Sequence, residues 1–473
     1  MKLSFLLSAC FVFIASTVNA QTEYLPNTEN KPSSVGHLED STSLLYAFKK
    51  GSIHGHLRNF FMATDNSKGL TDYYANATGG GIKYETASYK GFQLGLSGFF
   101  VFNMASSNLA KPDVKTNQLN RYEIGLFDIE DPKNKTDIDR LEELYLKYSR
   151  KNSQIVFGKQ LLNTPFINLQ DGRMRPTEVG GIWAEINKQG QTQIEAGFLY
   201  EMSPRSTVKW YGIGRSVGIY PAGINPDGTK SGYAGSIESK GVAMVGITHQ
   251  ALRGLTIKAW ELFTENVFNT AMLQADLQHD LYNGGKLVAS IQFIRQDAVK
   301  NGGNEDPVKT YFPKDNKART FGARIGWENS FWDASLNYNR ITKDGRYLLP
   351  REWGREPFYT FLPRERNEGF GDVHAYMARL GYTLSKARVK AQAGFGYYDL
   401  PAPENFRLNK YGMPSYTQLN IDLRYQFNGL LKGLESQLLF VHKGRAGNLP
   451  DDPRHIINKV NMNLWNLIFN YHF

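Results

Sequence analysis

The stretch YTQLNIDLRYQF, residues 416–427, decides the fold because its apolar and polar side chains alternate along its whole length. The apolar face holds Leu419, Ile421, Leu423, Tyr425 and Phe427, and the polar face holds Gln418, Asn420, Asp422, Arg424 and Gln426. A period of two is typical of a β-strand, in which successive side chains point to opposite sides. The stretch therefore predicts a strand with one apolar face and one water-facing face.

The same alternation returns along the rest of the chain, for example in RVKAQAGFGYY at 388–398. It also marks 51–62, 80–88, 91–103, 141–149, 153–160, 178–187, 191–201, 241–249, 254–264, 268–279, 286–296, 318–328, 331–341, 373–384, 434–443 and 459–473. Together these stretches predict 18 short amphipathic strands.

The connections between the predicted strands alternate between short and long. The short ones lie at 89–90, 150–152, 188–190, 251–254, 281–285, 329–330, 385–387 and 429–433, and the long ones at 104–140, 202–240, 297–317, 342–372, 399–415 and 444–458. Short periplasmic turns and long extracellular loops are typical of outer-membrane barrels, and an even strand count returns both chain ends to one side. The predicted fold is therefore an all-β, 18-stranded antiparallel up-and-down transmembrane β-barrel.

The composition of the 473-residue chain agrees with a barrel. A mean hydropathy of −0.44, without a run of 18 apolar residues after the leader, argues against a helical membrane protein. With 29 Phe, 26 Tyr and 7 Trp, the chain is too aromatic to be disordered. The last strand has an aromatic-rich face of the kind that meets lipid, formed by Trp465, Leu467, Phe469, Tyr471 and Phe473.

The first 20 residues are interpreted as a secretory signal peptide, because Lys2 precedes an apolar run that ends at the small-residue site Val18-Asn19-Ala20. The predicted organisation is a signal peptide at 1–20, a periplasmic lead-in at 21–50 and the barrel at 51–473. Lipidation at Cys10 is a weaker alternative, since it would leave an apolar tail behind the modified residue. Removal of residues 1–20 would leave a mature chain without a thiol, because Cys10 is the one cysteine of the sequence.

Two stretches carry a resemblance to a known family. The strand HGHLRNFF at 54–61, and the segment from Asn163-Thr164-Pro165 through DGRMRP at 171–176, resemble the corresponding parts of OprD-type outer-membrane porins. The resemblance implies an 18-stranded, mostly monomeric barrel for selective uptake of small solutes that usually bear a carboxylate. It also implies that the third loop, 161–177, folds into the pore and places Asp171 and Arg173 near the constriction. Arg175, which has no clear counterpart in the family pattern, is a third candidate there.

The water-facing sides of the strands predict a series of cations in the lumen. They are Arg58, Lys83, Arg324, Arg379, Arg388, Lys390 and Arg424. Guanidinium groups suit carboxylates bidentately, so a series of them offers an anion successive, replaceable partners. The alternative is that these cations pair with lumenal carboxylates such as Asp422 and Glu328. An opposing acidic wall, formed by Glu85, Glu143, Glu185 and Glu195, would orient a zwitterion.

Other motifs lack the context that their chemistry needs. The G-x-S-x-G pattern at 214–218 lies in a Gly- and Pro-rich loop without a following helix, which disfavours a hydrolase. His54 and His56 share a strand face, but two ligands make an incomplete metal site. The acidic stretch at 128–139 fits no calcium loop, and the positive residues form no contiguous stripe for nucleic acid. The arginines of the seventh loop, at 346–366, are expected to screen solutes at the mouth or to pack over it.

The sequence thus predicts a passive, substrate-selective porin of the cell outer membrane. No catalytic residue, cofactor or bound metal is expected, and the partners are small solutes, outer-membrane lipid and lipopolysaccharide, without nucleic acid. A monomer is favoured and a trimer stays open. The competing hypothesis is an outer-membrane adhesin or enzyme that uses the long loops.

Overall fold

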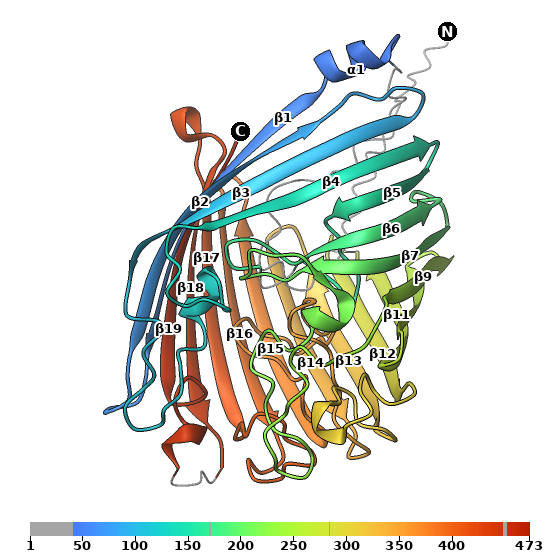
Figure 1. Cartoon of the computed structure of the whole chain (residues 1–473). Coiled ribbons are helices and arrows are strands. Elements are labelled where there is room, and N and C mark those ends of the chain that lie inside the picture. Colours follow the sequence, from blue (N-terminus) through green and yellow to red (C-terminus); the bar gives the residue numbers. More distant parts are fainter. Residues whose placement is uncertain (1–40, 170–171, 283, 448–451) are drawn as a thin grey trace.

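A closed β-barrel forms almost all of the chain in the computed structural model, which describes residues 41–169, 172–282, 284–447 and 452–473. Its nineteen strands form one antiparallel sheet, and the sheet closes because β1 (Ser52–Asp65) pairs with both β2 (Tyr73–Glu85) and β19 (Met462–His472). The short β8 (Tyr211–Gly212) only pairs two residues with the end of β7, so the other eighteen strands make the wall (Figure 1). The prediction of an 18-stranded barrel is confirmed.

The remaining strands follow one another around the wall in chain order. They are β3 (Phe92–Ser106), β4 (Ile138–Arg150), β5 (Ser153–Gln160), β6 (Glu178–Ile186), β7 (Thr192–Ser203), β9 (Val242–Leu252), β10 (Leu255–Thr264), β11 (Phe268–Asp280), β12 (Lys286–Ala298), β13 (Lys317–Glu328), β14 (Trp332–Ile341), β15 (Val373–Leu384), β16 (Val389–Asp399), β17 (Tyr416–Gln426) and β18 (Leu434–Arg445). Five short 3-10 helices lie in the connections: η1 (Glu123–Leu126), η2 (Ile213–Ser216), η3 (Pro307–Lys309), η4 (Gly429–Leu431) and η5 (Pro453–His455).

The largest error in strand position concerns β2, which begins at Tyr73 instead of residue 80. Its first half contains Ala75 and Ala77, which are small residues on the inward face and give little contrast in hydropathy. Pairing with β1 nevertheless extends the strand, since Tyr73 lies opposite Thr64. Tertiary pairing therefore decides where this strand starts.

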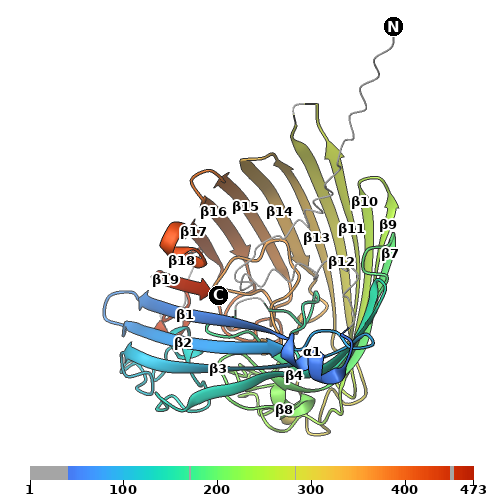
Figure 2. The ribbon, with the colours of Figure 1, turned by 90° about the horizontal axis from the view of Figure 1, so that it is seen from above.

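The two rims of the barrel differ in their connections (Figure 1). One rim, here called the turn rim, has eight short connections, and the other has the loops. The loops are L1 (66–72), L2 (107–137), L3 (161–177), L4 (204–241), L5 (265–267), L6 (299–316), L7 (342–372), L8 (400–415) and L9 (446–461). Seen from above, loop segments lie within the outline of the ring of strands (Figure 2).

The alternation of side chains separates an outer face from a lumenal face. Leu57 on β1 is 51% exposed, whereas its neighbour Arg58 is 2% exposed because it points into the protein. On β17, Ile421 and Leu423 are exposed on the outside, and Asn420 is buried on the inside. The outer face is thus apolar and the lumen polar, as the period of two predicts.

One α-helix, α1 (Leu44–Lys49), precedes the barrel at the turn rim (Figure 1). Ser43 begins it as the N-cap, accepting a hydrogen bond from the backbone N–H of Tyr46. In the described residues, no helix has the length and apolar character required to cross a bilayer. The predicted signal peptide and residues 21–40 of the lead-in lie outside the described residues.

Candidate functional site

Loop L7 lies against the lumenal face of the barrel. The ring of Tyr359 packs over Gly322 on β13, where an added Cβ would be 3.1 Å from the ring. Leu362 lies over Gly394 on β16, at 2.7 Å from the position of an added Cβ. Glycine at these two positions leaves room for the loop, since an added Cβ would force the loop side chains to shift. L7 therefore occupies the lumen rather than the mouth.

The tip of L7 is fixed to three strands. The carbonyl of Pro363 accepts hydrogen bonds from the side-chain amides of Gln418 and Asn420 on β17. Arg364 donates to Asn466 Oδ1 on β19 at 3.0 and 3.2 Å, and its guanidinium lies 5.9 Å from the ring of Phe60 on β1. Its φ of +80° is rare for a residue with a side chain, so these contacts hold a strained conformation.

Glu365 then joins L7 to another strand and another loop. Its carboxylate accepts from Lys443 Nζ on β18 at 2.6 Å and from Arg121 of L2 at 2.8 Å. Burial alone would raise the pKa of Glu365, but the charges of Arg121 and Lys443 outweigh it and lower the pKa to about 2. The loop tip is thus held by two ion pairs of Glu365, which stay formed at physiological pH because the carboxylate remains ionised.

Loop L3 packs against L7 and L4. Asn168 of L3 donates its backbone N–H to Trp353 O at 3.1 Å and its side chain to Arg355 O at 2.9 Å. Trp353 is fully buried and donates its indole N–H to Ser216 Oγ of L4 at 3.0 Å. Ser216 is itself buried and donates to Ile213 O, so the G-x-S-x-G serine has a structural role in joining the loops.

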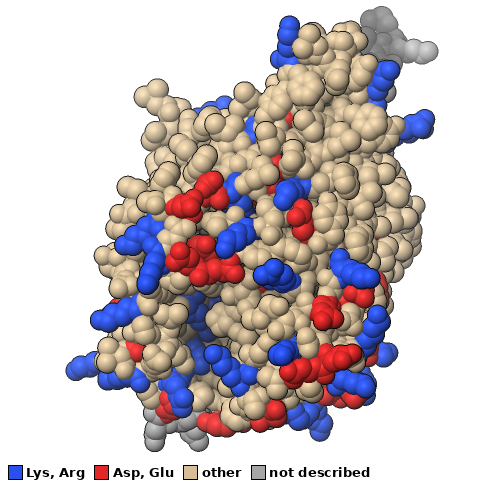
Figure 3. All heavy atoms as spheres, in the orientation of Figure 1, with Lys and Arg blue, Asp and Glu red and all other residues tan. Residues whose placement is uncertain are grey.

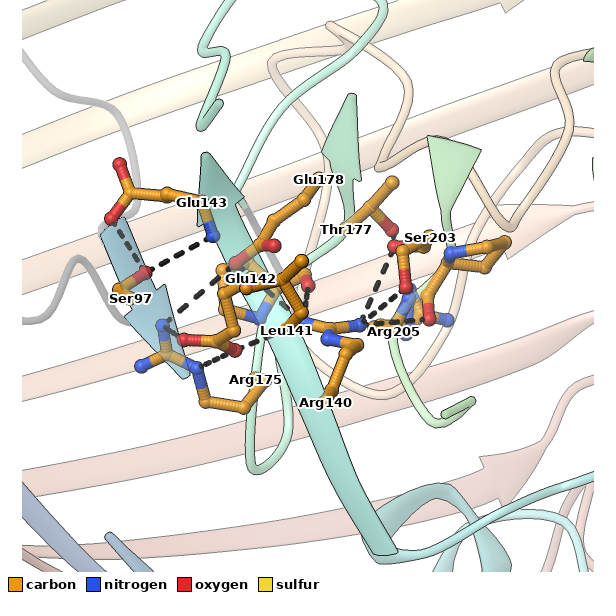
Figure 4. A network of polar contacts seen from close by, with 12 residues as sticks. Ser97, Arg140, Leu141, Glu142, Glu143, Arg175, Thr177, Glu178, Ser203 and Arg205 are labelled. Carbon is orange, nitrogen blue, oxygen red and sulfur yellow. Dashed lines mark hydrogen bonds and ion pairs between the residues drawn. The ribbon is translucent and has the colours of Figure 1, made fainter. Parts of the chain in front are cut away.

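The three predicted constriction residues of L3 have different surroundings. Arg175 is ion-paired with Glu142, and its guanidinium lies 4.6 Å from the ring of Phe99 on β3 (Figure 4). Arg173 is buried beside η1 of L2, where its side chain lies 3.3 Å from the position of an added Cβ on Gly125. Asp171 lies outside the described residues. Arg175 thus lies among lumenal side chains of the wall, and Arg173 packs against L2.

A β-bulge in β4 builds the site that receives Arg175. The register shifts between the pairs Leu96–Leu144 and Gly98–Leu141, so two residues of β4 lie opposite Ser97. Both of them, Glu142 and Glu143, are buried. Bulges re-aim side chains in this way at sites of function. The spacing of three between the outward-facing Leu141 and Leu144 is the sequence signal that would have revealed the bulge.

Arg140 is the central residue of this network and was not predicted from the sequence (Figure 4). Its guanidinium donates to the carbonyl of Pro176 in L3 at 2.9 Å and to that of Pro204 in L4 at 3.2 Å. It also pairs with Glu142 at 3.2 Å and with Glu178 at 3.7 Å. Two loops are therefore attached to β4 through one buried cation.

The predicted acidic wall consists mostly of ion pairs. Glu143 binds Lys83 at 2.8 Å, and Glu85 binds Lys147 at 3.1 Å. Glu185 pairs with Lys188 of the next turn. We call this side of the lumen the paired wall. Its members are Lys83, Glu85, Glu143, Lys147 and Glu185 from these pairs, together with Arg140, Glu142, Arg175 and Glu178. Three of the four predicted glutamates are thus ion-paired, and for Glu195 no ion pair is found within the residues that the structure describes.

On the other side of the lumen lies the basic wall, which we define as Arg324 (β13), Arg379 (β15), Lys390 (β16) and Arg424 (β17). Arg379 lies 3.5 Å from Asp333, and Arg424 binds Asp422 at 3.0 Å. Within the described part of the chain, Arg324 and Lys390 have no carboxylate within 4.0 Å. Lys390 and Arg424 occupy directly opposed positions in the pairing of β16 with β17.

Two further predicted cations lie elsewhere. Arg58 lies on β1, where the barrel closes against β19. It donates to Asn470 Oδ1 on β19 at 3.1 Å, and its guanidinium lies 5.2 Å from the ring of Phe60. Arg388 does not belong to the lumenal series. It lies exposed in the turn before β16 with a φ of +56°, and it donates to the carbonyl of Phe427. Arg388 is in phase with Lys390, but β16 begins only at Val389, so Arg388 stays in the turn and outside the lumen.

The two histidines of β1, His54 and His56, have different surroundings. The ring of His56 stacks on that of His472 at 4.4 Å, and its Nδ1 lies 3.4 Å from Arg175. His54 is exposed near the turn rim. Among the residues that the structure describes, no group of three or more His, Cys, Asp or Glu side chains is arranged to hold a metal ion.

Comparison with known proteins identifies relatives of this chain in sequence and in structure. The sequence model described as outer membrane porin, OprD family, matches residues 48–349. Among solved structures, OpdK of Pseudomonas aeruginosa, crystallised with vanillate, is 13% identical with a TM-score of 0.69 over 90% of this chain and 99% of that one. OccK9 (OpdG) of the same organism and OccAB2 of Acinetobacter baumannii are each 14% identical with a TM-score of 0.70 over the same shares. No curated protein sequence matches the chain significantly.

At these identities the solved structures show a common fold, whereas the family match covers well over half of the sequence. The chain therefore belongs to the OprD family of outer membrane porins, which are channels for small solutes and not enzymes.

Proposed function

We propose that this porin favours small anions, above all carboxylate-bearing solutes such as organic acids, amino acids and small peptides. The observation that carries the proposal is the direct opposition of Lys390 and Arg424 in the lumen. Side chains in such cross-strand positions start about 5 Å apart, and like charges there repel each other. An anion between them would relieve the repulsion, and Lys390 has no carboxylate within 4.0 Å in the described residues.

The neighbouring cations extend this position into a path. Arg379 and Arg324 lie on β15 and β13, within the same third of the wall. A carboxylate would exchange one guanidinium partner for the next, and the nearby Asp333 and Asp422 would keep each site weak enough for release. Such a row raises the local concentration of anions and the rate at which they enter.

The paired wall supports the same conclusion by offering little net charge. Its glutamates are already bound to Lys83, Lys147, Arg140 and Arg175, so they attract solute cations weakly. L3 and L7 would narrow the path between the two walls, with Arg175 and the undescribed Asp171 as constriction residues and Arg173 acting through its packing. One chain encloses the whole path, so a monomer suffices for transport.

Planar-bilayer recording of the purified protein across a KCl gradient tests the proposal. Vanillate and its neutral analogue vanillyl alcohol are then added in turn. We expect a reversal potential of the sign for anion preference and current block by vanillate but not by the alcohol. Cation preference, or equal block by both compounds, would overturn the proposal.

A further inference from the structure

Helix α1 presents apolar side chains to solvent at the turn rim. Leu44, Leu45 and Phe48 are 59%, 66% and 44% exposed, and Ala47 is the helix's one buried residue. Lys49 and the following Lys50 are exposed beside them. A short helix with apolar and cationic side chains side by side is typical of a segment at a membrane surface.

The contacts of α1 place it at the lipid-facing side of the barrel. The hydroxyl of Tyr84 on β2 donates to the carbonyl of Phe48. Tyr84 points outward, because it shares a strand face with Ile82, which is 63% exposed, and lies opposite Ile53 on β1, which is 68% exposed. Helix α1 therefore lies beyond the rim at the end of β2 (Figure 1), bonded to an outward-facing side chain of the wall.

The connections of the turn rim contain basic residues but no acidic ones. The connections 86–91, 151–152, 187–191, 253–254, 281–285, 329–331, 385–388 and 427–433 contain no Asp or Glu. They contain seven cations: Lys90, Lys151, Lys188, Arg253, Lys386, Arg388 and Lys432. Two of these, Lys188 and Arg253, pair with Glu185 and Asp280 at the adjoining strand ends. Figure 3 shows Lys and Arg side chains standing out at this end of the molecule, whereas both signs mix over the loop end.

Apolar side chains also protrude from the same turns. Tyr282 and Leu430 are completely exposed at the tips of the connections after β11 and β17, and Leu431 is half exposed. Cations next to protruding apolar groups match the boundary of a bilayer with anionic headgroups, where the two kinds of side chain bind phosphate and acyl chains respectively.

We propose that α1 and the turn rim bind anionic phospholipid at the bilayer surface. Leu44, Leu45 and Phe48 lie in the interfacial region, and Lys49 and Lys50 contact lipid phosphates. Lipid is favoured over a protein partner because α1 is bonded to an outward-facing side chain of the wall. In addition, six helical residues offer far less than the roughly 800 Å² that each partner contributes to a stable protein interface.

The test uses a fluorophore sensitive to polarity at Leu45→Cys, in the full chain with Cys10→Ser, so that it is the single thiol. The protein is inserted into phosphatidylcholine vesicles whose acyl chains are brominated. The matched control is Val114→Cys in L2, which is 86% exposed at the opposite rim. We expect the label at residue 45 to be quenched by the brominated chains and shielded from aqueous iodide, and the label at residue 114 to show the reverse.

The charged half of the proposal is tested by adding phosphatidylglycerol to the vesicles. Quenching at residue 45 should deepen with anionic lipid, and Lys49→Gln/Lys50→Gln should remove this dependence while preserving quenching by the acyl chains. Near an anionic surface each lysine is worth about fivefold in membrane affinity. If the label at residue 45 is quenched equally in both vesicle types in the protein that keeps Lys49 and Lys50, the role of these lysines is overturned.

Two results would overturn the proposal as a whole. One is a label at residue 45 that is as accessible to iodide in vesicles as in detergent, which would mean that α1 stays in water. The other is a label already shielded from iodide in detergent, which would mean that protein covers the helix.

Discussion

The two sides of the lumen contain similar residue types but arrange them differently. On the paired wall, Glu143 and Lys83 lie 2.8 Å apart, and the buried Arg140 serves two carboxylates and two loops. On the basic wall, Arg324 and Lys390 have no carboxylate within 4.0 Å in the described residues. The comparison teaches that ion-paired residues in the lumen stabilise the channel structure, whereas cations without a carboxylate partner can bind the solute.

The first prediction tests the structural side of this comparison. Replacing Arg140→Met should lower the free energy of unfolding by about 3–5 kcal/mol, because it removes one of the two cations that the buried Glu142 and Glu178 share with Arg175, and leaves the carbonyls of Pro176 and Pro204 without their donor. Urea unfolding of the protein in lipid vesicles measures the change. Arg253→Met is the control, since that side chain is 97% exposed and should change stability by less than about 0.5 kcal/mol. Equal effects of the two variants would contradict the role of Arg140.

A second prediction concerns the buried carboxylate of Glu123 in η1, which accepts a hydrogen bond from Thr64. Burial raises its pKa to about 7. Between the unfolded pKa of about 4.5 and about 7, the folded protein holds a proton that the unfolded chain has released. Stability should therefore be greatest below this window and fall as pH rises through it, by on the order of 3 kcal/mol.

Unfolding curves at pH 5 and pH 8 measure this loss. Glu123→Gln cannot titrate, so its stability should change less over the same range. If the variant and the natural protein lose stability equally, Glu123 is not the group responsible.

The third prediction tests the functional side. Lys390→Gln should weaken current block by vanillate about five- to tenfold, since the interaction of a partly screened charge pair is worth about 1 kcal/mol. The measurement is the block constant from titration in planar bilayers. Arg388→Gln serves as the control because Arg388 lies in the turn and should leave the constant unchanged. An effect at residue 388 as large as that at residue 390 would place the binding site at the rim instead.

The smallest effect is expected for the ion pair of the paired wall. Lys83→Gln and Glu143→Gln should shift the reversal potential in opposite directions, and the double variant should restore it to within a few millivolts of the natural value. The coupling follows because the two charges cancel each other in the lumen. A double variant whose reversal potential stays displaced as far as that of either single variant would show that the two charges do not cancel each other.

Much of the barrel could be predicted from the sequence because each strand buries one face. The period of two in β17 fixes which side chains meet lipid and which meet water, and the prediction of Arg424 and Lys390 as lumenal residues follows from it. The same rule fails at Glu142, where a bulge interrupts the alternation. It also fails at Arg388, because alternation alone does not reveal where a strand ends.

The loops could not be predicted in the same way. L7 enters the lumen because Tyr359 and Leu362 find glycines on β13 and β16, and because Arg364 and Glu365 find partners on β19 and β18. Each of these contacts joins residues far apart in the chain, and no local pattern encodes them. The burial of Arg173 against Gly125 of L2 is another such long-range contact.

The most direct test of the account compares reversal potentials in one KCl gradient for three heat-modifiable, folded proteins. They are the natural protein, the basic-wall variant Arg324→Gln/Lys390→Gln and the paired-wall variant Lys83→Gln/Glu143→Gln. The account predicts anion preference in the natural protein and in the paired-wall variant, and its loss in the basic-wall variant. Anion preference that survives in the basic-wall variant would contradict the account.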